Sequence, residues 1–209
     1  MIKRIAVVLS TLAFAFVILA ISVFNSYSPR VFSASPQLTP PTAEAEIATP
    51  IDYVFVFTGS VLPDSPFWYL KALRDRIWLT VTTNPMRKAE LSVLFADKRL
   101  LASEKLFKNN KSQLALSTLT KAEKYLENAS ELEAKERKIG TDTKSFLATL
   151  AKASLAHIAK IKQLVVIAPD DIKPGIIRAQ DYPIGVYTRC RDTLQSFGVV
   201  APKNPFTEN

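Results

Sequence analysis

Apolar residues recur at spacings of three and four from residue 66 onward, which is the pattern of helices that each bury one face. Two helix-start signals divide the first part of this region. Each signal is a polar residue followed by proline: Ser65 with Pro66, and Asn84 with Pro85. The polar side chain can accept a hydrogen bond from an amide in the first turn of the helix, and proline has no amide hydrogen that would be left without a partner. The sequence therefore predicts one helix from residue 66 to about 82 and a second that starts at residue 85.

The first of these helices has an apolar stripe that we expect to be buried. Its members are Phe67, Leu70, Leu73, Ile77, Trp78 and Val81. The stripe has a second interpretation, because aromatic residues such as Trp68 beside Lys71, Arg74 and Arg76 are also typical of a helix on a membrane surface. We favour core packing, since the downstream helices need an apolar partner.

Three further helices follow from the same periodicity. We expect them at residues 112–139, capped by Ser112 and stopped by Gly140, at residues 143–166, and at residues 183–197. Their expected buried residues include Leu119, Ala122, Leu126 and Ala129, then Leu147, Leu150, Ile158 and Ile161, then Tyr187, Cys190, Leu194 and Phe197. Residues 170–180 are interpreted as a loop, and the tail after residue 198 as loose. The prediction is an all-α, antiparallel bundle of long helices.

The amino-terminal region has a different pattern. Lys3 and Arg4 precede twenty uncharged, mostly apolar residues, 5–24, enough for a helix to cross a hydrocarbon core of about 30 Å. The basic pair predicts a single-pass anchor in the cell membrane, with a cytoplasmic amino terminus and the bulk of the chain outside the cytoplasm. A cleaved signal peptide and a secreted product are the alternative.

These patterns divide the chain into four parts. Residues 1–26 form the transmembrane anchor or uncleaved signal, and 27–50 form a proline-rich linker. Residues 51–168 are a helical domain that begins with an extended segment at 51–57. Residues 169–209 are a loop, a short helix and a tail.

Composition and charge restrict the kinds of molecule that the chain is expected to bind. Five glycines among 209 residues argue against a phosphate-binding loop, and we expect no cofactor. Without Lys3 and Arg4, 25 basic residues remain against 19 acidic ones, which favours weak contact with anionic lipid or wall polymer. Nucleic acid is not an expected partner, because the sequence contains no recognisable binding module.

Few residues are candidates for chemistry. His157 is the single histidine, and its place beside an apolar stripe predicts a core or boundary position. Cys190 is the single cysteine, so no intramolecular disulfide can form, and we expect a buried thiol. Asp170 with Asp171, and the group Glu131, Glu133 and Glu136, are interpreted as solvated acids rather than metal ligands. The sequence thus predicts no catalytic, cofactor or metal site, and no enzyme activity.

Short motifs resemble a bacterial family known as domain of unknown function 5667. They include Leu62, Pro63, Ser65, Pro66, Phe67 and Leu70, then Lys88, Ala89 and Glu90, then Arg99 and Leu100. The likeness extends over about residues 53–165. It implies an exported helical domain, often tethered to a membrane, and it implies no catalytic residues.

The function we expect is a protein-interaction or structural module of the cell envelope, which binds an envelope protein or another copy of itself. The alternative is an envelope sensor of a ligand, metal or stress. Such a sensor would act through another membrane protein, because only about four residues are expected in the cytoplasm.

Overall fold

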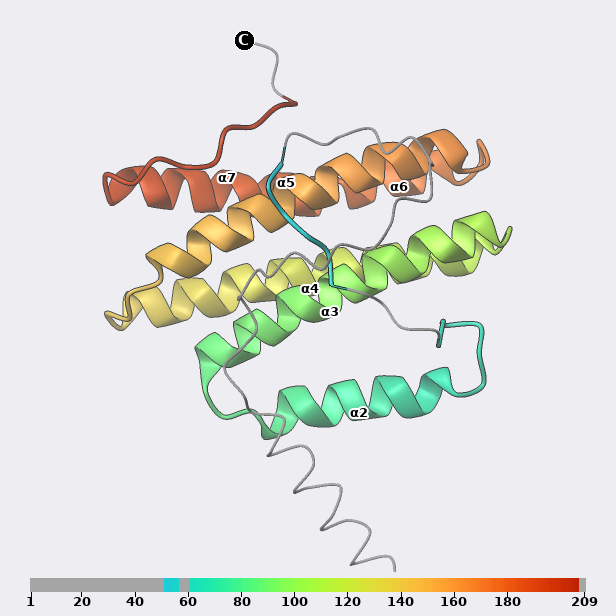
Figure 1. Ribbon diagram of the computed structural model, residues 1–209, viewed down its shortest axis with the longest axis horizontal. Helices are drawn as coiled ribbons and strands as arrows, with labels where there is room; N and C mark the ends of the chain where they lie inside the picture. Colours follow the sequence, from blue (N-terminus) through green and yellow to red (C-terminus); the bar gives the residue numbers. More distant parts are fainter. Residues whose placement is uncertain (1–50, 57–60, 207–209) are drawn as a thin grey trace, which may run out of the picture. The chain divides into compact units, whose positions relative to one another are not determined.

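The computed structural model describes residues 51–56 and 61–206, so the predicted anchor and linker lie outside the described residues. All regular secondary structure in the described part is helical (Figure 1). The helices are α2 (Trp68–Val81), α3 (Pro85–Lys108), α4 (Ser112–Lys138), α5 (Lys144–Ile167), α6 (Lys173–Ala179) and α7 (Asp181–Ser196). The predicted all-α bundle is confirmed.

The antiparallel pair α3 and α4 is the centre of the bundle. Small residues allow the two helices to approach closely: Ala96, Ala115, Ala122 and Ala129 all have 0 % exposure. The Ser103 hydroxyl donates to the carbonyl of Ala115 at 2.8 Å, so a buried polar group is also satisfied between the helices. The helices α5 and α7 cover one side of this pair, and α2 lies beyond α3 on the other (Figure 1).

The helix-start signals had different outcomes. The Asn84 side chain accepts from the amide of Arg87 at 2.9 Å, with Pro85 as the first helical residue, as predicted. Ser65 does not cap α2, because it lies in a turn before the helix, where its hydroxyl oxygen accepts from the amide of Phe67 at 3.3 Å. Ser112 is the first residue of α4 and not its cap. Gly140 follows α4 with a φ of +93°, the left-handed conformation expected there.

The expected stripes of α4, α5 and α7 are buried, with one exception at the end of α7. Leu119, Leu126, Leu150 and Leu194 have 0 % exposure. Phe197, which follows the last residue of α7, is 40 % exposed. The extended segment 51–56 lies across the helices as predicted, with alternate residues packed against the core.

Two predictions for the carboxyl-terminal region were wrong. Part of the expected loop is the short helix α6, because Ile172, Ile176 and Ala179 recur at helical spacing and are buried. The tail also packs on the domain as far as residue 206. Its carbonyl at Pro202 accepts from the Tyr187 hydroxyl at 2.8 Å, and Phe206 contacts the core.

Trp78 is half-buried against Phe95, but the prediction that the rest of the apolar stripe of α2 is buried was wrong. Its exposures are 65 % for Phe67, 67 % for Leu70, 55 % for Leu73, 51 % for Ile77 and 59 % for Val81. The spacing correctly placed these residues on one face, but that face points away from α3, the one helix that α2 approaches. Among the described helices, none is long and apolar enough to span a membrane.

Candidate functional site

Four polar side chains from distant parts of the sequence meet inside the bundle, and we call them the His157 network. His157 on α5 contacts Glu123 on α4 through Nδ1, at 2.9 Å and 3.1 Å from the two carboxylate oxygens. Its Nε2 lies 3.1 Å from Asp97 Oδ1 on α3. The hydroxyl of Tyr53, from the extended segment, donates to Asp97 Oδ2 at 2.8 Å. The network therefore connects three helices and the segment that crosses them.

The imidazole and the two carboxylates of the network are closed to solvent. His157 and Glu123 have 0 % exposure, and Asp97 has 1 %. Burial alone lowers the pKa of His157, but the neighbouring carboxylates of Glu123 and Asp97 outweigh it and raise the pKa to about 10. The imidazole is therefore a cation at neutral pH, with a carboxylate at each ring nitrogen. Burial, followed by the charge of Asp97, raises the pKa of Tyr53, so that side chain stays a neutral donor.

Sequence periodicity explains how these charges come to lie inside. Asp97 falls between Val93 and Leu100 on the buried face of α3, and Glu123 occupies the equivalent place between Leu119 and Leu126 on α4. His157 was correctly predicted to lie in the core, whereas its two acidic partners were missed. The available signal was a charged residue at a stripe position. Because Lys, Glu, Arg and Asp are rarely buried without a partner, such a residue predicts a buried partner of opposite charge.

The geometry of the network favours packing over chemistry. Both ring nitrogens of His157 are used by the protein, and the Phe55 ring lies 5.7 Å from the imidazole. A general base needs a free position within hydrogen-bond reach of a substrate proton. This arrangement offers no such position, and instead fixes the register of α3, α4 and α5.

Cys190 is also buried, with 1 % exposure, as predicted. Burial, together with the negative charge of Glu133, raises the pKa of the thiol to about 12. Since the thiolate is the reactive form of cysteine, this residue is a packing element at neutral pH.

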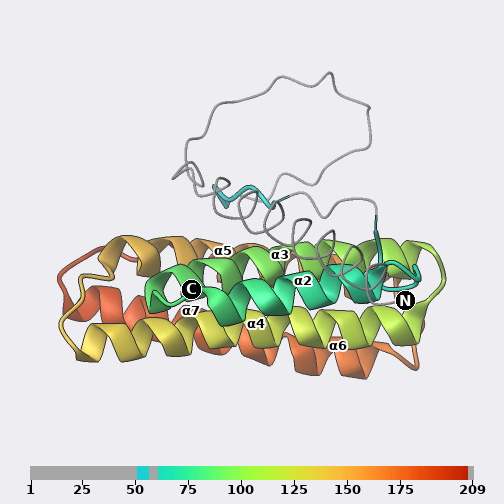
Figure 2. The ribbon, with the colours of Figure 1, turned by 90° about the horizontal axis from the view of Figure 1, so that it is seen from below.

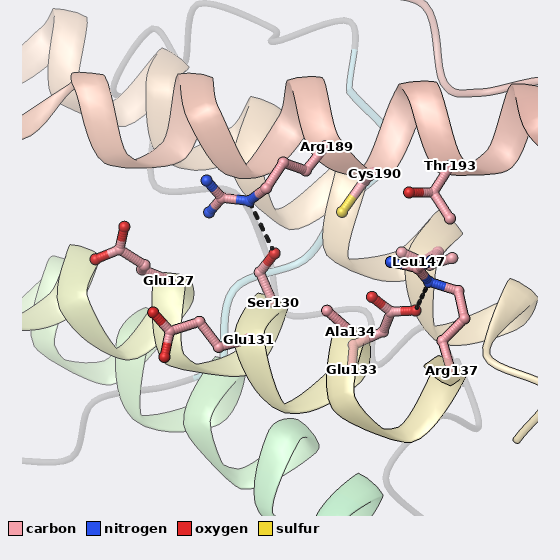
Figure 3. A pocket seen from close by; sticks show the side chains of 10 residues that line it. All are labelled: Glu127, Ser130, Glu131, Glu133, Ala134, Arg137, Leu147, Arg189, Cys190 and Thr193. Atoms are coloured by element: carbon pink, nitrogen blue, oxygen red, sulfur yellow. Dashed lines mark hydrogen bonds and ion pairs between the residues drawn. The ribbon is translucent and has the colours of Figure 1, made fainter. Parts of the chain in front are cut away.

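The thiol lies beside a groove of about 220 Å³ between α4 and α7 (Figure 3). Arg189 reaches from α7 and donates to the hydroxyl of Ser130 at 3.3 Å. Glu133 faces the other end of the groove, where it accepts from Arg137 at 3.0 Å and from Thr143 at 2.6 Å. These contacts join α4 to α7 and to the start of α5, so three of the charged groups that line the groove already have partners.

The expected solvated face at the end of α4 is only partly correct. Glu131 is exposed and Glu136 is half-buried, but Glu133 is buried with 2 % exposure. Glu133 continues the stripe that contains Leu126 and Ala129, which explains its position. Within residues 51–56 and 61–206, no group of three His, Cys, Asp or Glu side chains could hold a metal ion.

Arg99 forms a second unusual contact in the interior. Its side chain is buried, with 7 % exposure, and its guanidinium lies 4.4 Å from the centre of the Tyr125 ring. The rings of Phe95 and Trp68 are 5.7 Å and 5.9 Å away. A cation over aromatic faces is stabilised by their quadrupoles. Arg99 thus joins α2 to α3 and α4.

The other motif residues fall into two groups. Leu62 and Pro63 are half-buried in the turn before α2, together with Ser65, while Pro66, Phe67 and Leu70 are exposed. In α3, Ala89 and Leu100 are fully buried, and Glu90 forms an ion pair with Arg87 at 2.6 Å. Lys88 is half-buried. The α3 residues hold the bundle together, whereas part of the first motif lies on the surface.

A family model described as a domain of unknown function, DUF5667, matches residues 60–171. This chain belongs to the DUF5667 family. The DUF5667 match begins just before the turn that precedes α2 and ends just after α5, so α6 and α7 lie entirely beyond it. No curated protein and no solved structure matches this DUF5667 chain.

Proposed function

We propose that this chain is a membrane-anchored, extracytoplasmic module of the cell envelope that acts by binding other molecules at its surface. One contrast supports this proposal: the titratable side chains suited to chemistry are enclosed, whereas an apolar helix face is exposed. Exposed apolar surfaces that are contiguous are typical of interaction sites.

The enclosed side chains support a module without enzyme activity. The imidazole of His157 is held between two carboxylates, and the thiol of Cys190 has a pKa of about 12. Catalytic side chains instead need open, convergent positions in a cleft.

The anchor is supported by sequence alone. Residues 5–24 are long and apolar enough to cross a bilayer, and Lys3 and Arg4 favour a cytoplasmic amino terminus. The linker at 27–50 would then hold the helical domain outside the cytoplasm. The secreted alternative requires cleavage within this same region.

Crosslinking in intact cells tests the proposal. A photoreactive residue at Glu131, which is exposed beside the α4–α7 groove, should give a discrete adduct with one envelope protein or with a second copy of the chain. The same protein without irradiation is the matched control and should give none. The intact chain should sediment with membranes. An intact chain in detergent-free soluble extract, or no adduct at any exposed position, would contradict the proposal.

A further inference from the structure

The outer face of α2 exposes a continuous apolar surface, which we call the α2 stripe. Its members are Phe67, Leu70, Leu73, Ile77 and Val81, each more than half exposed, with Tyr69 beside them at 79 %. Single exposed apolar residues are common on proteins, but these follow one another along the whole helix. The helix lies below the other helices in Figure 1 and in front of them in Figure 2, which is seen from below.

The α2 stripe is not needed to attach α2 to the domain. The opposite face makes that attachment: Trp78 packs edge-on against Phe95 with ring centres 6.2 Å apart, and Trp68 contacts Arg99. Near the amino end of α2, Lys111 forms a 2.6 Å ion pair with Asp64. The stripe is therefore a surface additional to the packing face.

The exposed charged side chains of α2 itself are all positive. Because each residue turns a helix by about 100°, Arg74 and Arg76 lie on opposite sides of the stripe. Both are exposed. The single acid of α2, Asp75, has 3 % exposure, faces inward and pairs with Arg74 at 2.7 Å. The outward face of α2 thus combines apolar residues with flanking cations, and the helix itself has no exposed carboxylate.

This combination matches an anionic bilayer surface. Helices that lie in the membrane interface bury an apolar face among the acyl chains, while flanking Arg side chains extend to the lipid phosphates. An aromatic residue such as Tyr69 is favoured at the same depth. Each basic residue near an anionic surface adds to the attraction.

The length of the chain permits this contact. If residues 5–24 are an anchor, the 26 residues of 25–50 could reach about 80 Å when extended, at about 3.1 Å per residue. The helix α2 itself is about 21 Å long, at 1.5 Å per residue. A tether of this reach keeps α2 at high local concentration near lipid. This step rests on the proposed function.

We propose that the α2 stripe lies on the outer surface of the anchoring membrane, where it binds anionic phospholipid. The domain is then held by two contacts, the anchor and α2. The helices α5 and α7, on the other side of the bundle from α2, face away from the bilayer and are left for a protein partner (Figure 1).

Depth-dependent fluorescence quenching in the full chain tests this proposal. Cys190→Ala removes the one native cysteine, and a new cysteine at Leu73 carries an environment-sensitive fluorophore. The protein is reconstituted into vesicles of equal parts phosphatidylglycerol and phosphatidylcholine. With nitroxide-labelled lipid, the fluorophore at position 73 should shift to the blue and lose most of its emission. Ile77 provides an equivalent second position.

Two matched controls define the specificity. A fluorophore at Lys124, exposed on α4, should keep its emission in the same vesicles. Arg76→Glu should reduce quenching at position 73, because it changes the charge beside the stripe by two units. We expect the ratio of membrane-docked to undocked domain to fall by roughly tenfold or more. Lys124→Glu makes the same charge change away from α2 and should have no effect.

Several results would overturn the proposal. The first is unquenched emission from the fluorophore at position 73 in a chain that still floats with the vesicles. The second is a blue shift without quenching, which would indicate that protein and not lipid covers the position. Protection that grows with the ratio of protein to lipid would indicate a second copy instead. Equal quenching in pure phosphatidylcholine would remove the role of anionic lipid. A chain that does not float with vesicles would contradict the anchor, which is a separate failure.

Discussion

The His157 network and the α2 stripe reverse the usual placement of charged and apolar residues. Three ionisable side chains with at most 1 % exposure lie at the centre of the bundle, while five large apolar side chains of α2 are more than half exposed. In the first region each charge has a partner of opposite sign, so burial is tolerated. In the second, no described helix covers the face. The first region specifies the fold, and the second is available for binding.

The largest effect should come from removing the cation of the network. His157→Ala leaves Asp97 and Glu123 buried without their partner, which costs about 3–5 kcal/mol of folding free energy. Denaturant unfolding of a fragment beginning at Ile47, the first residue of the compact unit, measures this loss. Lys124→Ala on the surface of α4 is the control. A loss below about 1 kcal/mol would show that the network is not a structural element.

The same network predicts a pH dependence. His157 has a pKa of about 10 in the folded chain, above its ordinary value of 6.5, so its contribution is complete below about pH 6.5 and is lost as the pH rises through 10. The difference in unfolding free energy between the native fragment and His157→Gln should shrink over this range. Tyr53→Phe controls for the other group in the network. A difference that stays constant or grows would contradict the assignment.

Arg99→Ala should have a smaller effect, about 2 kcal/mol, because it removes both the cation over three rings and the packing of its stem. It should also loosen α2, which we expect to see as a faster hydrogen exchange of the α2 amides. Arg76→Ala is the control, because Arg76 is exposed on α2. It should change the free energy of unfolding by no more than about 0.5 kcal/mol. Equal losses for the two arginines would contradict the role given to Arg99.

Asn84 lies at the corner between α2 and α3, where the two regions join. Asn84→Ala removes the hydrogen bond that caps α3 and should cost about 1 kcal/mol by thermal or denaturant unfolding. Asn109→Ala provides the matched control at the other end of α3, where the asparagine is exposed and contributes its backbone amide to the cap. Equal losses of unfolding free energy for the two substitutions would show that the Asn84 side-chain cap does not stabilise α3.

Much of the fold follows from the spacing of apolar residues. The stripes of α4 and α5, the cap at Asn84 and the stop at Gly140 were predictable because each depends on neighbours within a few residues. The segment that contains α6 was not recognised, because its Pro174 and Gly175 resemble turn residues while its buried contacts come from distant helices.

The candidate site was harder to predict for the same reason. Periodicity places residues on a common face, but it does not say whether a neighbour covers that face. This is why the α2 stripe was expected in the core. The acidic partners of His157 come from 34 and 60 residues away, so their meeting depends on how the helices pack.

The most direct test of the account is the same substitution made in the two regions. Leu126→Ala on α4 removes a side chain with 0 % exposure and should cost about 2–5 kcal/mol, whereas Leu73→Ala on α2 starts from 55 % exposure and should change the free energy of unfolding by no more than about 0.5 kcal/mol. Both are measured by denaturant unfolding of the fragment that begins at Ile47. Comparable losses would mean that the α2 stripe is part of the core, which would contradict the account.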